Sequence, residues 1–173
     1  MTAIAPVNRP DIAEKAEQVL EQAAAAGIMV ATAESCTGGL LAAALTAIEG
    51  ESNAFDRGFV TYTGDAKQDL LGLDRAFLAR HGEVSEETAR AMAQAVLDRS
   101  KAGLVCATTG YTGKAEPGGE DGLVYIAAMH RDRRLLLREC HFGERDRAEA
   151  RHLTVEAALD MLIEALADLR RHT

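Results

Sequence analysis

A serine between a buried-strand pattern and a helix pattern is the first group that could do chemistry. Ser35 lies in AESCTGG, just before Gly38 and Gly39. A helix N-terminus offers free backbone N–H groups that can bind an anion, and glycines let a ligand approach the main chain closely. Ser35 or Thr37 could equally be a simple N-cap, and Glu34 could be a solvated strand end.

Two further segments end in polar residues that could join such a serine. Lys67 in TYTGDAK could take a proton from a serine if burial or a nearby cation kept it neutral; otherwise it is a surface lysine. Tyr62 precedes it, and tyrosine is also common in strands. The segment ATTGYTGKAEPGGEDG contains Thr109, Gly110 and Gly113. It could bind a phosphate or be a surface loop, and it matches neither GxGxxG nor the P-loop pattern.

Three arginines near the start of the last helix could bind an anion. Arg145, Arg147 and Arg151 lie in FGERDRAEAR. Arg147 and Arg151 are four residues apart, so they share one helix face, and two guanidiniums could bind one phosphate. Salt bridges to the neighbouring acidic side chains are the alternative that spacing alone favours.

Composition limits the classes of function. The 173 residues carry a formal net charge of -8, which argues against nonspecific nucleic-acid binding. The three cysteines show no paired spacing and the five histidines form no metal-binding motif, so we expect no disulfide framework, no metal and no cofactor. No apolar run approaches the roughly 20 residues that span a bilayer, and no signal peptide is recognisable. We therefore expect a cytoplasmic protein without a membrane partner.

The elements that must position these residues alternate along the chain. We interpret residues 1–9 as an N-terminal arm and residues 10–173 as one domain. Helices are predicted at residues 12–26, 40–50, 65–73, 74–82, 84–100 and 146–169, and strands at 27–34, 58–63, 103–110, 123–130 and 135–140. Ser85 is predicted to cap its helix, and RDRR at 131–134 to form a hairpin turn.

This order predicts an α/β fold. It favours a three-layer α/β/α sandwich around a mixed, mostly parallel sheet of about five strands, one of which is antiparallel. Ligands of such sheets bind beyond the carboxyl ends of the strands. The segments ending in AESCTGG, TYTGDAK and ATTGYTGKAEPGG would meet there if their strands are parallel neighbours.

Four blocks in the same order resemble a known family. ATAESCTGGLLAAALT, VTYTGDAKQDLLGL, HGEVSEETARAMA and TTG…PGG…GLVYIA are similar to the C-terminal domain of the CinA family, over residues 10–170. This is the nicotinamide mononucleotide deamidase family, also known as competence/damage-inducible protein. The resemblance implies an α/β/α fold and hydrolysis of the carboxamide of nicotinamide mononucleotide to nicotinic acid mononucleotide and ammonia.

The resemblance also implies roles for individual residues. Ser35 matches the family's motif serine, the expected nucleophile, and Lys67 its lysine, the expected base or proton shuttle, with Tyr62 beside it. Main-chain donors at Thr37, Gly38 and Gly39 could hold an oxyanion or a phosphate. The resemblance matches Arg147 and Arg151 to the family's arginine block, with Arg145 as an alternative. We expect the Ser35–Gly39 segment, the loop that contains Thr109, Gly110 and Gly113, and Arg147 or Arg151 to converge on one pocket.

The sequence departs from the family around this pocket. Thr63 and Gly64 stand where the family usually has Ser-Asn, and TGYTGKAEPGG replaces TGIAGPGG, which introduces Lys114. These changes leave open an amidase with a different substrate, or a catalytically silent nucleotide-binding or competence-related module. The chain resembles the stand-alone form of the family. We expect a small-molecule nucleotide substrate and, from the family and the Ala-rich helices, a homo-oligomer.

Overall fold

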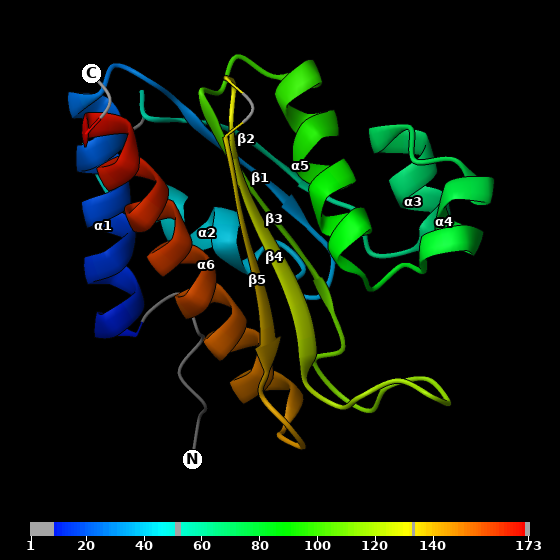
Figure 1. Cartoon of the computed structure of the whole chain (residues 1–173). Coiled ribbons are helices and arrows are strands. Elements are labelled where there is room, and N and C mark those ends of the chain that lie inside the picture. Colours follow the sequence, from blue (N-terminus) through cyan, green and yellow to red (C-terminus); the bar gives the residue numbers. More distant parts are fainter. Residues whose placement is uncertain (1–8, 51–52, 133, 172–173) are drawn as a thin grey trace.

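A five-stranded sheet forms the centre of the protein in the computed structural model, which describes residues 9–50, 53–132 and 134–171 (Figure 1). The strands stand in the order β2-β1-β3-β4-β5. Their bounds are Val30–Glu34 (β1), Phe55–Val60 (β2), Leu104–Gly110 (β3), Leu123–His130 (β4) and Leu135–His141 (β5). Strand β1 pairs in parallel with β2 and β3, whereas β4 runs antiparallel to both β3 and β5. The mixed sheet with one antiparallel strand is therefore confirmed.

Helices cover both faces of this sheet (Figure 1). One face carries α1 (Pro10–Ala25), α2 (Leu40–Thr46) and α6 (Arg147–Arg171), and the other carries α5 (Glu86–Arg99) with α3 (Gly64–Ala66), the π-helix η2 (Lys67–Leu71) and α4 (Arg75–His81) beside it. A separate cluster of buried, mostly aliphatic side chains lies between each face of the sheet and the helices that cover it. No helix in the described ranges is long and apolar enough to cross a membrane. The three-layer fold is thus confirmed, while the arm predicted at residues 1–9 falls, apart from Arg9, outside the described residues.

The second strand begins and ends three residues before its predicted bounds of 58–63. The prediction missed the first half of this strand because Asp56 and Arg57 are charged. A strand at the edge of a sheet can expose such side chains. A register shift between Val30 and Ala31 accommodates Asp56, whose carboxylate accepts from the N–H of Lys101 at 3.0 Å. The last ladder bond runs from Thr61 N–H to the Glu34 carbonyl (2.7 Å), so residues 62 and 63 lie beyond the strand.

Two helices also differ from their predicted lengths. Helix α2 ends at Thr46 rather than at Gly50; at this end the Thr46 hydroxyl donates to the carbonyl of Ala42 at 2.8 Å, a bond that weakens helices. The helix predicted at 65–73 is one turn of α-helix followed by the π-helix η2, which Gly72 ends with a φ of 76°. The predicted N-cap at Ser85 is confirmed, since its hydroxyl accepts from the N–H of Thr88. The hairpin between β4 and β5 is confirmed as well, although residue 133 in its turn lies outside the described residues.

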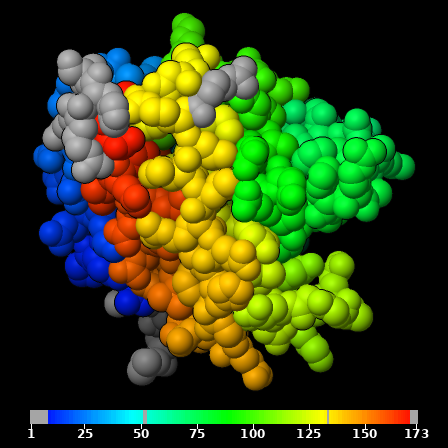
Figure 2. Space-filling view, viewed as in Figure 1, coloured from blue at the N-terminus to red at the C-terminus, as the bar shows by residue number. Residues whose placement is uncertain are grey.

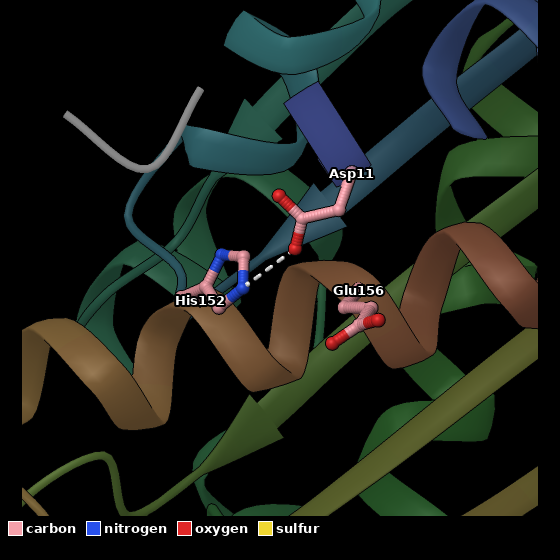
Figure 3. Close-up of side chains that lie close together, drawn as sticks. All are labelled: Asp11, His152 and Glu156. Carbon is pink, nitrogen blue, oxygen red and sulfur yellow. Dashed lines mark ion pairs between the residues drawn. The ribbon is translucent and has the colours of Figure 1, made fainter. Parts of the chain in front are cut away.

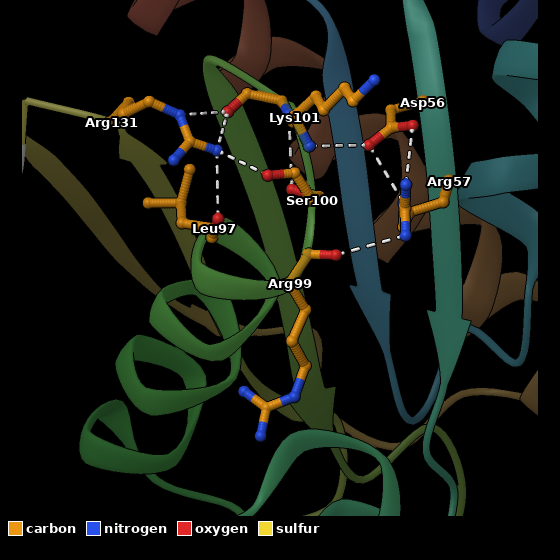
Figure 4. Close-up of polar contacts among 8 residues, drawn as sticks. Asp56, Arg57, Leu97, Arg99, Ser100, Lys101 and Arg131 are labelled. Carbon is orange, nitrogen blue, oxygen red and sulfur yellow. Dashed lines mark hydrogen bonds and ion pairs between the residues drawn. The ribbon is translucent and has the colours of Figure 1, made fainter.

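Arginines close the carboxyl end of α5, at the sheet edge opposite to the predicted site (Figure 4). The Arg131 guanidinium donates to the carbonyls of Leu97 (3.0 Å), Ser100 (2.9 Å) and Ala102 (2.7 Å). Arg57 donates to the carbonyl of Arg99 at 3.2 Å. The last carbonyls of a helix lack partners within the helix and carry partial negative charge, so these cations satisfy and stabilise them.

We expect Arg131→Ala to lower the free energy of unfolding by about 2 kcal/mol. Hydrogen bonds to charged groups contribute about 1.5–3 kcal/mol each, and the partial exposure of the Arg131 guanidinium weakens its bonds to the three carbonyls. Urea titration measures the loss. Arg90→Ala is the matched control, because Arg90 makes an exposed ion pair with Glu86 (2.9 Å) and should cost less than about 0.5 kcal/mol. Equal losses in the two variants would contradict a capping role for Arg131.

Candidate active site

A pocket of about 340 Å³ opens at the carboxyl ends of β1 and β3. Figure 2 shows the surface hollowed between the helices α3 and α4 and the projecting loop 111–122. Polar side chains and glycines dominate its lining, which comprises Ser35, Cys36, Tyr62, Lys67, Gly82, Glu83, Val84, Thr109, Gly110, Tyr111, Thr112, Gly113, Lys114, Glu116 and Arg147. The three segments that end in AESCTGG, TYTGDAK and ATTGYTGKAEPGG thus meet at one edge of the sheet.

A buried serine and a buried lysine form the floor of this pocket. The Nζ atom of Lys67 donates to the Oγ atom of Ser35 at 3.2 Å, and the residues are 1% and 7% exposed. Lys67 is the first residue of the π-helix, a rare form that is frequent at functional sites. Its second partner is a carboxylate, Oε2 of Glu83, at 3.1 Å. The burial that a chemical role for Lys67 requires is therefore present.

Ser35 is not an N-cap of α2. The helix begins at Leu40, and its N-cap residue Gly39 has no side chain to cap it. The cap is the carboxylate of Glu34, which accepts from the N–H groups of Gly39 (2.9 Å), Leu41 (3.1 Å) and Ala42 (2.8 Å). Glu34 is 0% exposed, so it is not a solvated strand end. Because its carboxylate fills the helix N-terminus, this terminus offers no free site to an anion.

The residues around Gly38 contact other parts of the protein and do not line the pocket. The hydroxyl of Thr37 lies 2.7 Å from Glu34 Oε2 and 2.9 Å from Thr108 Oγ1, and Thr37 is fully buried. Arg151 donates to the carbonyl of Thr37 at 2.6 Å. Gly38 has a φ of 61°, and a Cβ there would lie 2.8 Å from the Arg151 guanidinium. Of the predicted substrate contacts, Thr37, Gly38, Gly39 and Arg151 are thus absent from the pocket lining.

The glycine-rich loop forms one wall of the pocket, and the hairpin β3–β4 fixes its base. Gly110 must lack a side chain, since a Cβ would lie 2.6 Å from the Val124 side chain and 2.7 Å from the Leu123 carbonyl. The hydroxyl of Thr109 donates to the main-chain carbonyl of Glu83 at 2.7 Å, which ties this wall to the opposite one. Gly113 lies against Arg147, whose guanidinium would be 3.1 Å from a Cβ at that position.

The outer end of the pocket is cationic. Arg147 donates to the hydroxyl of Tyr62 at 3.2 Å, and Lys114 lines the same end. Within the described residues, neither Arg147 nor Lys114 has an acidic partner within ion-pair distance. Arg145 instead bonds the Phe142 carbonyl (3.0 Å) and pairs with Glu149 (3.0 Å). The three arginines near the start of α6 thus differ in position: Arg147 lines the pocket, Arg151 binds the Thr37 carbonyl and Arg145 lies on the surface.

Sequence reasoning missed Glu83 and Cys36. Glu83 lies in the connection between α4 and α5, within the block HGEVSEETARAMA, but nothing in its sequence context assigned it a role. Cys36 follows the serine and lines the pocket, but burial raises the pKa of its thiol to about 12. A thiol with such a pKa is almost entirely protonated at neutral pH and is a poor nucleophile. The hydroxyl beside it, which faces the lysine, is the better candidate.

A second cluster of ionisable side chains lies outside the pocket (Figure 3). Asp11, His152 and Glu156 bring potential metal-ligand atoms within 4.8 Å of one another, an arrangement that no sequence spacing indicated. His152 Nε2 pairs with Asp11 at 3.2 Å, and Lys15 Nζ lies 3.0 Å from Glu156. Burial raises the pKa of Asp11, but the charges of Arg9 and His152 outweigh it and lower this pKa overall. Ion pairs that join α1 to α6 account for the cluster.

Fold and site together define the class: a three-layer α/β/α protein with a buried serine–lysine pair beyond the carboxyl ends of its parallel strands. The sequence model of the CinA C-terminal domain matches residues 12–166. The chain belongs to this family, as the resemblance in its four sequence blocks implied.

Relatives and solved structures agree with this assignment. A CinA-like protein of Syntrophus aciditrophicus is 42% identical over 160 residues, which cover 87% of this chain and 37% of the relative. The crystal structure of the competence/damage inducible protein CihA from Agrobacterium tumefaciens is 44% identical, with a TM-score of 0.88 over 96% of this chain and 99% of that one. A CinA superfamily protein of Klebsiella pneumoniae is 33% identical, with a TM-score of 0.85 over 91% of this chain and 98% of that one. The chain spans about a third of the length of the curated relatives it matches.

Proposed function

We propose that the protein hydrolyses the carboxamide of nicotinamide mononucleotide to nicotinic acid mononucleotide and ammonia. The observation that carries the proposal is the buried contact of 3.2 Å between Lys67 Nζ and Ser35 Oγ on the floor of the pocket. A serine is a weak nucleophile until a neighbouring base removes its proton, and a lysine in its neutral form can do so. A pair of this kind suits acyl transfer from an amide.

The proposed course has two halves and uses only side chains of this protein. Ser35 Oγ attacks the carboxamide carbon while neutral Lys67 takes the hydroxyl proton. The tetrahedral intermediate then expels ammonia, whose nitrogen takes up one proton from the site, and an ester to Ser35 remains. Water hydrolyses this ester and releases the acid. The N–H of Ser35 donates to the Thr108 carbonyl at 3.0 Å, so this N–H does not bind the oxyanion.

The cationic end of the pocket supports a phosphorylated substrate. With a net charge of -8 the long-range field repels anions, so affinity for a nucleotide must come from local groups. Arg147 and Lys114 supply two cations at the outer end, and Tyr62 adds a hydroxyl. We place the phosphate there and the carboxamide at Ser35. The volume of about 340 Å³ lies within the range of small-ligand pockets.

Ammonia release from nicotinamide mononucleotide by the purified protein tests the proposal. A coupled ammonia assay and chromatography of the product should show stoichiometric ammonia and nicotinic acid mononucleotide. Binding of the nucleotide without release would favour a silent nucleotide-binding module. Release from other amides only would favour an amidase with a different substrate.

We place the protein in the cytoplasm, and its three free cysteines agree with a reducing compartment. The homo-oligomer and the single domain at 10–173 stay predictions.

Arg147→Ala should raise KM for nicotinamide mononucleotide tenfold to a hundredfold, because a charge-assisted hydrogen bond contributes about 1.5–3 kcal/mol. The value of kcat/KM for the riboside, which lacks the phosphate, should change less than about threefold. Arg145→Ala is the matched control and should leave both substrates unaffected, since Arg145 pairs with Glu149 outside this pocket. Steady-state kinetics on both substrates measures the difference. Equal losses for the two substrates after Arg147→Ala would place the phosphate elsewhere.

A further inference from the structure

A carboxylate, that of Glu83, also contacts the serine–lysine pair and has no role in the course described above. The carboxylate of Glu83 lies 3.1 Å from Lys67 Nζ, the atom that also donates to Ser35 Oγ. Its side chain is 49% exposed and lines the pocket, whereas Lys67 is buried. The main chain of Glu83 is held in place by the Thr109 hydroxyl, which donates to its carbonyl at 2.7 Å. The carboxylate therefore connects the buried lysine to the space that substrate and water must enter.

The room for this carboxylate comes from a glycine. A Cβ at Gly64 would lie 2.6 Å from Glu83 Oε1. The φ of Gly64 is not in the left-handed region, so the backbone does not require glycine at this position. The absence of a side chain there gives Glu83 its place beside Lys67. Position 64 is also one of the two positions where the chain departs from the Ser-Asn of the family pattern.

The ion pair raises a question of proton transfer. A lysine paired with a carboxylate holds an ammonium group, which donates hydrogen bonds and accepts none. Lys67 can take the proton of Ser35 only after it has given up one of its own. Glu83 is the acceptor in direct contact with it, and a carboxylate at the pocket surface also reaches incoming water.

We propose that Glu83 is a third catalytic residue, which carries protons between Lys67, the leaving ammonia and the hydrolytic water; this rests on the proposed amide hydrolysis. In the first half, Lys67 passes a proton to Glu83 and then takes the hydroxyl proton of Ser35 as Oγ bonds to the carboxamide carbon. The C–N bond breaks, and the leaving nitrogen takes the proton of Glu83 and departs as ammonia. Lys67 is then an ammonium and Glu83 a carboxylate, as at the start.

The second half runs through the same groups. Glu83 takes a proton from a water molecule whose oxygen bonds to the ester carbon. The ester C–O bond then breaks, the acid leaves, and Ser35 Oγ takes a proton from Lys67. Glu83 returns its proton to Lys67, which restores all three groups. Each half consumes and releases the same number of protons at the protein.

Glu83→Gln separates proton transfer from positioning, because a glutamine can still accept a hydrogen bond from Lys67 but cannot take its proton. General acid–base catalysis contributes about 10²–10⁴-fold, so we expect kcat for nicotinamide mononucleotide to fall at least about 100-fold. Because both halves pass a proton through Glu83, single-turnover release of ammonia and hydrolysis of the acyl-protein should both slow. Glu87→Gln, an exposed carboxylate outside the pocket lining, is the matched control and should keep the wild-type rate.

The outcomes are distinguishable. A Glu83→Gln variant that stays within about threefold of the wild type would overturn the proposal and leave the Ser35–Lys67 chemistry standing. A slow variant whose single-turnover release of ammonia keeps the wild-type rate would overturn the role of Glu83 in the first half. A wild-type protein that releases no ammonia would overturn the proposed function itself, and this proposal with it.

Gly64→Ala gives an independent test. The added methyl group would displace the flexible end of the Glu83 side chain, with no backbone strain and no change of charge. We expect a loss of kcat in the same direction as for Glu83→Gln, and unchanged thermal unfolding. The double variant should be no slower than Glu83→Gln, since both changes act on the same proton transfer between Lys67 and position 83. Additive losses would mean that Gly64 acts independently of Glu83 and would overturn the part assigned to it.

Discussion

Ser35→Ala is expected to reduce ammonia release at least about 10⁴-fold while the protein stays folded. Loss of a catalytic nucleophile typically removes several orders of magnitude of rate, because no other group forms the covalent intermediate. The hydroxyl of Ser35 bonds to Lys67, and Lys67 keeps its ion pair with Glu83 when that hydroxyl is removed. The free energy of unfolding should therefore change by less than about 1 kcal/mol.

A second serine provides the matched control for this variant. Ser85 caps α5, and its replacement by alanine should cost about 1 kcal/mol of stability without loss of activity. The two serine variants should thus show opposite patterns, one inactive and stable, the other active and less stable. Substantial turnover by Ser35→Ala would show that a different group attacks the amide.

Replacement of Lys67 should have the second-largest effect. Lys67→Met keeps most of the buried aliphatic stem and removes the amino group, and we expect kcat to fall about 10³- to 10⁴-fold. Lys67 is 1% exposed, but its partner Glu83 is 49% exposed, so the carboxylate left behind is hydrated and is not an unpaired buried charge. Thermal unfolding of the variant should therefore remain close to that of the wild type.

Lys67→Arg tests whether the side chain at position 67 must transfer a proton or need only supply a positive charge. Arginine could keep an ion pair with Glu83, but its guanidinium does not lose a proton in proteins. We expect this variant to be as slow as Lys67→Met, with ammonia release as the measurement and thermal unfolding as the check on folding. An active arginine variant would contradict proton transfer through Lys67 and would leave it an electrostatic role.

Local patterns were sufficient to predict most of the fold. Apolar periodicity locates the helices and strands because each element buries one face, and Ser85 is recognisable as a cap because the cap acts on its own helix. Strand β2 was displaced in the prediction, since Asp56 and Arg57 lie on an exposed edge where apolar alternation is not required. The sequence also indicated which segments meet at the carboxyl ends of the strands.

The arrangement within the site could not be predicted in the same way. Glu83 reaches Lys67 across 16 residues and two helices, and the space for it depends on Gly64. Arg147 and Arg151 share a helix face, yet one reaches the pocket and the other the Thr37 carbonyl, because the pocket lies toward the start of the helix. Such differences depend on tertiary packing, which the spacing of residues along one helix does not contain.

The base of the pocket loop has a consequence for how this family can diversify. The N–H of Tyr111 donates to the Leu123 carbonyl at 2.8 Å, and the N–H of Gly122 donates to the Tyr111 carbonyl at 3.1 Å. These bonds close the loop at the point where β3 and β4 join, so its tip projects away from the sheet (Figure 1). Insertions and exchanges in the tip therefore leave strand pairing intact. The loop can thus change its length and side chains, and with them the wall of the pocket, while the contact between Ser35 and Lys67 on the floor is kept.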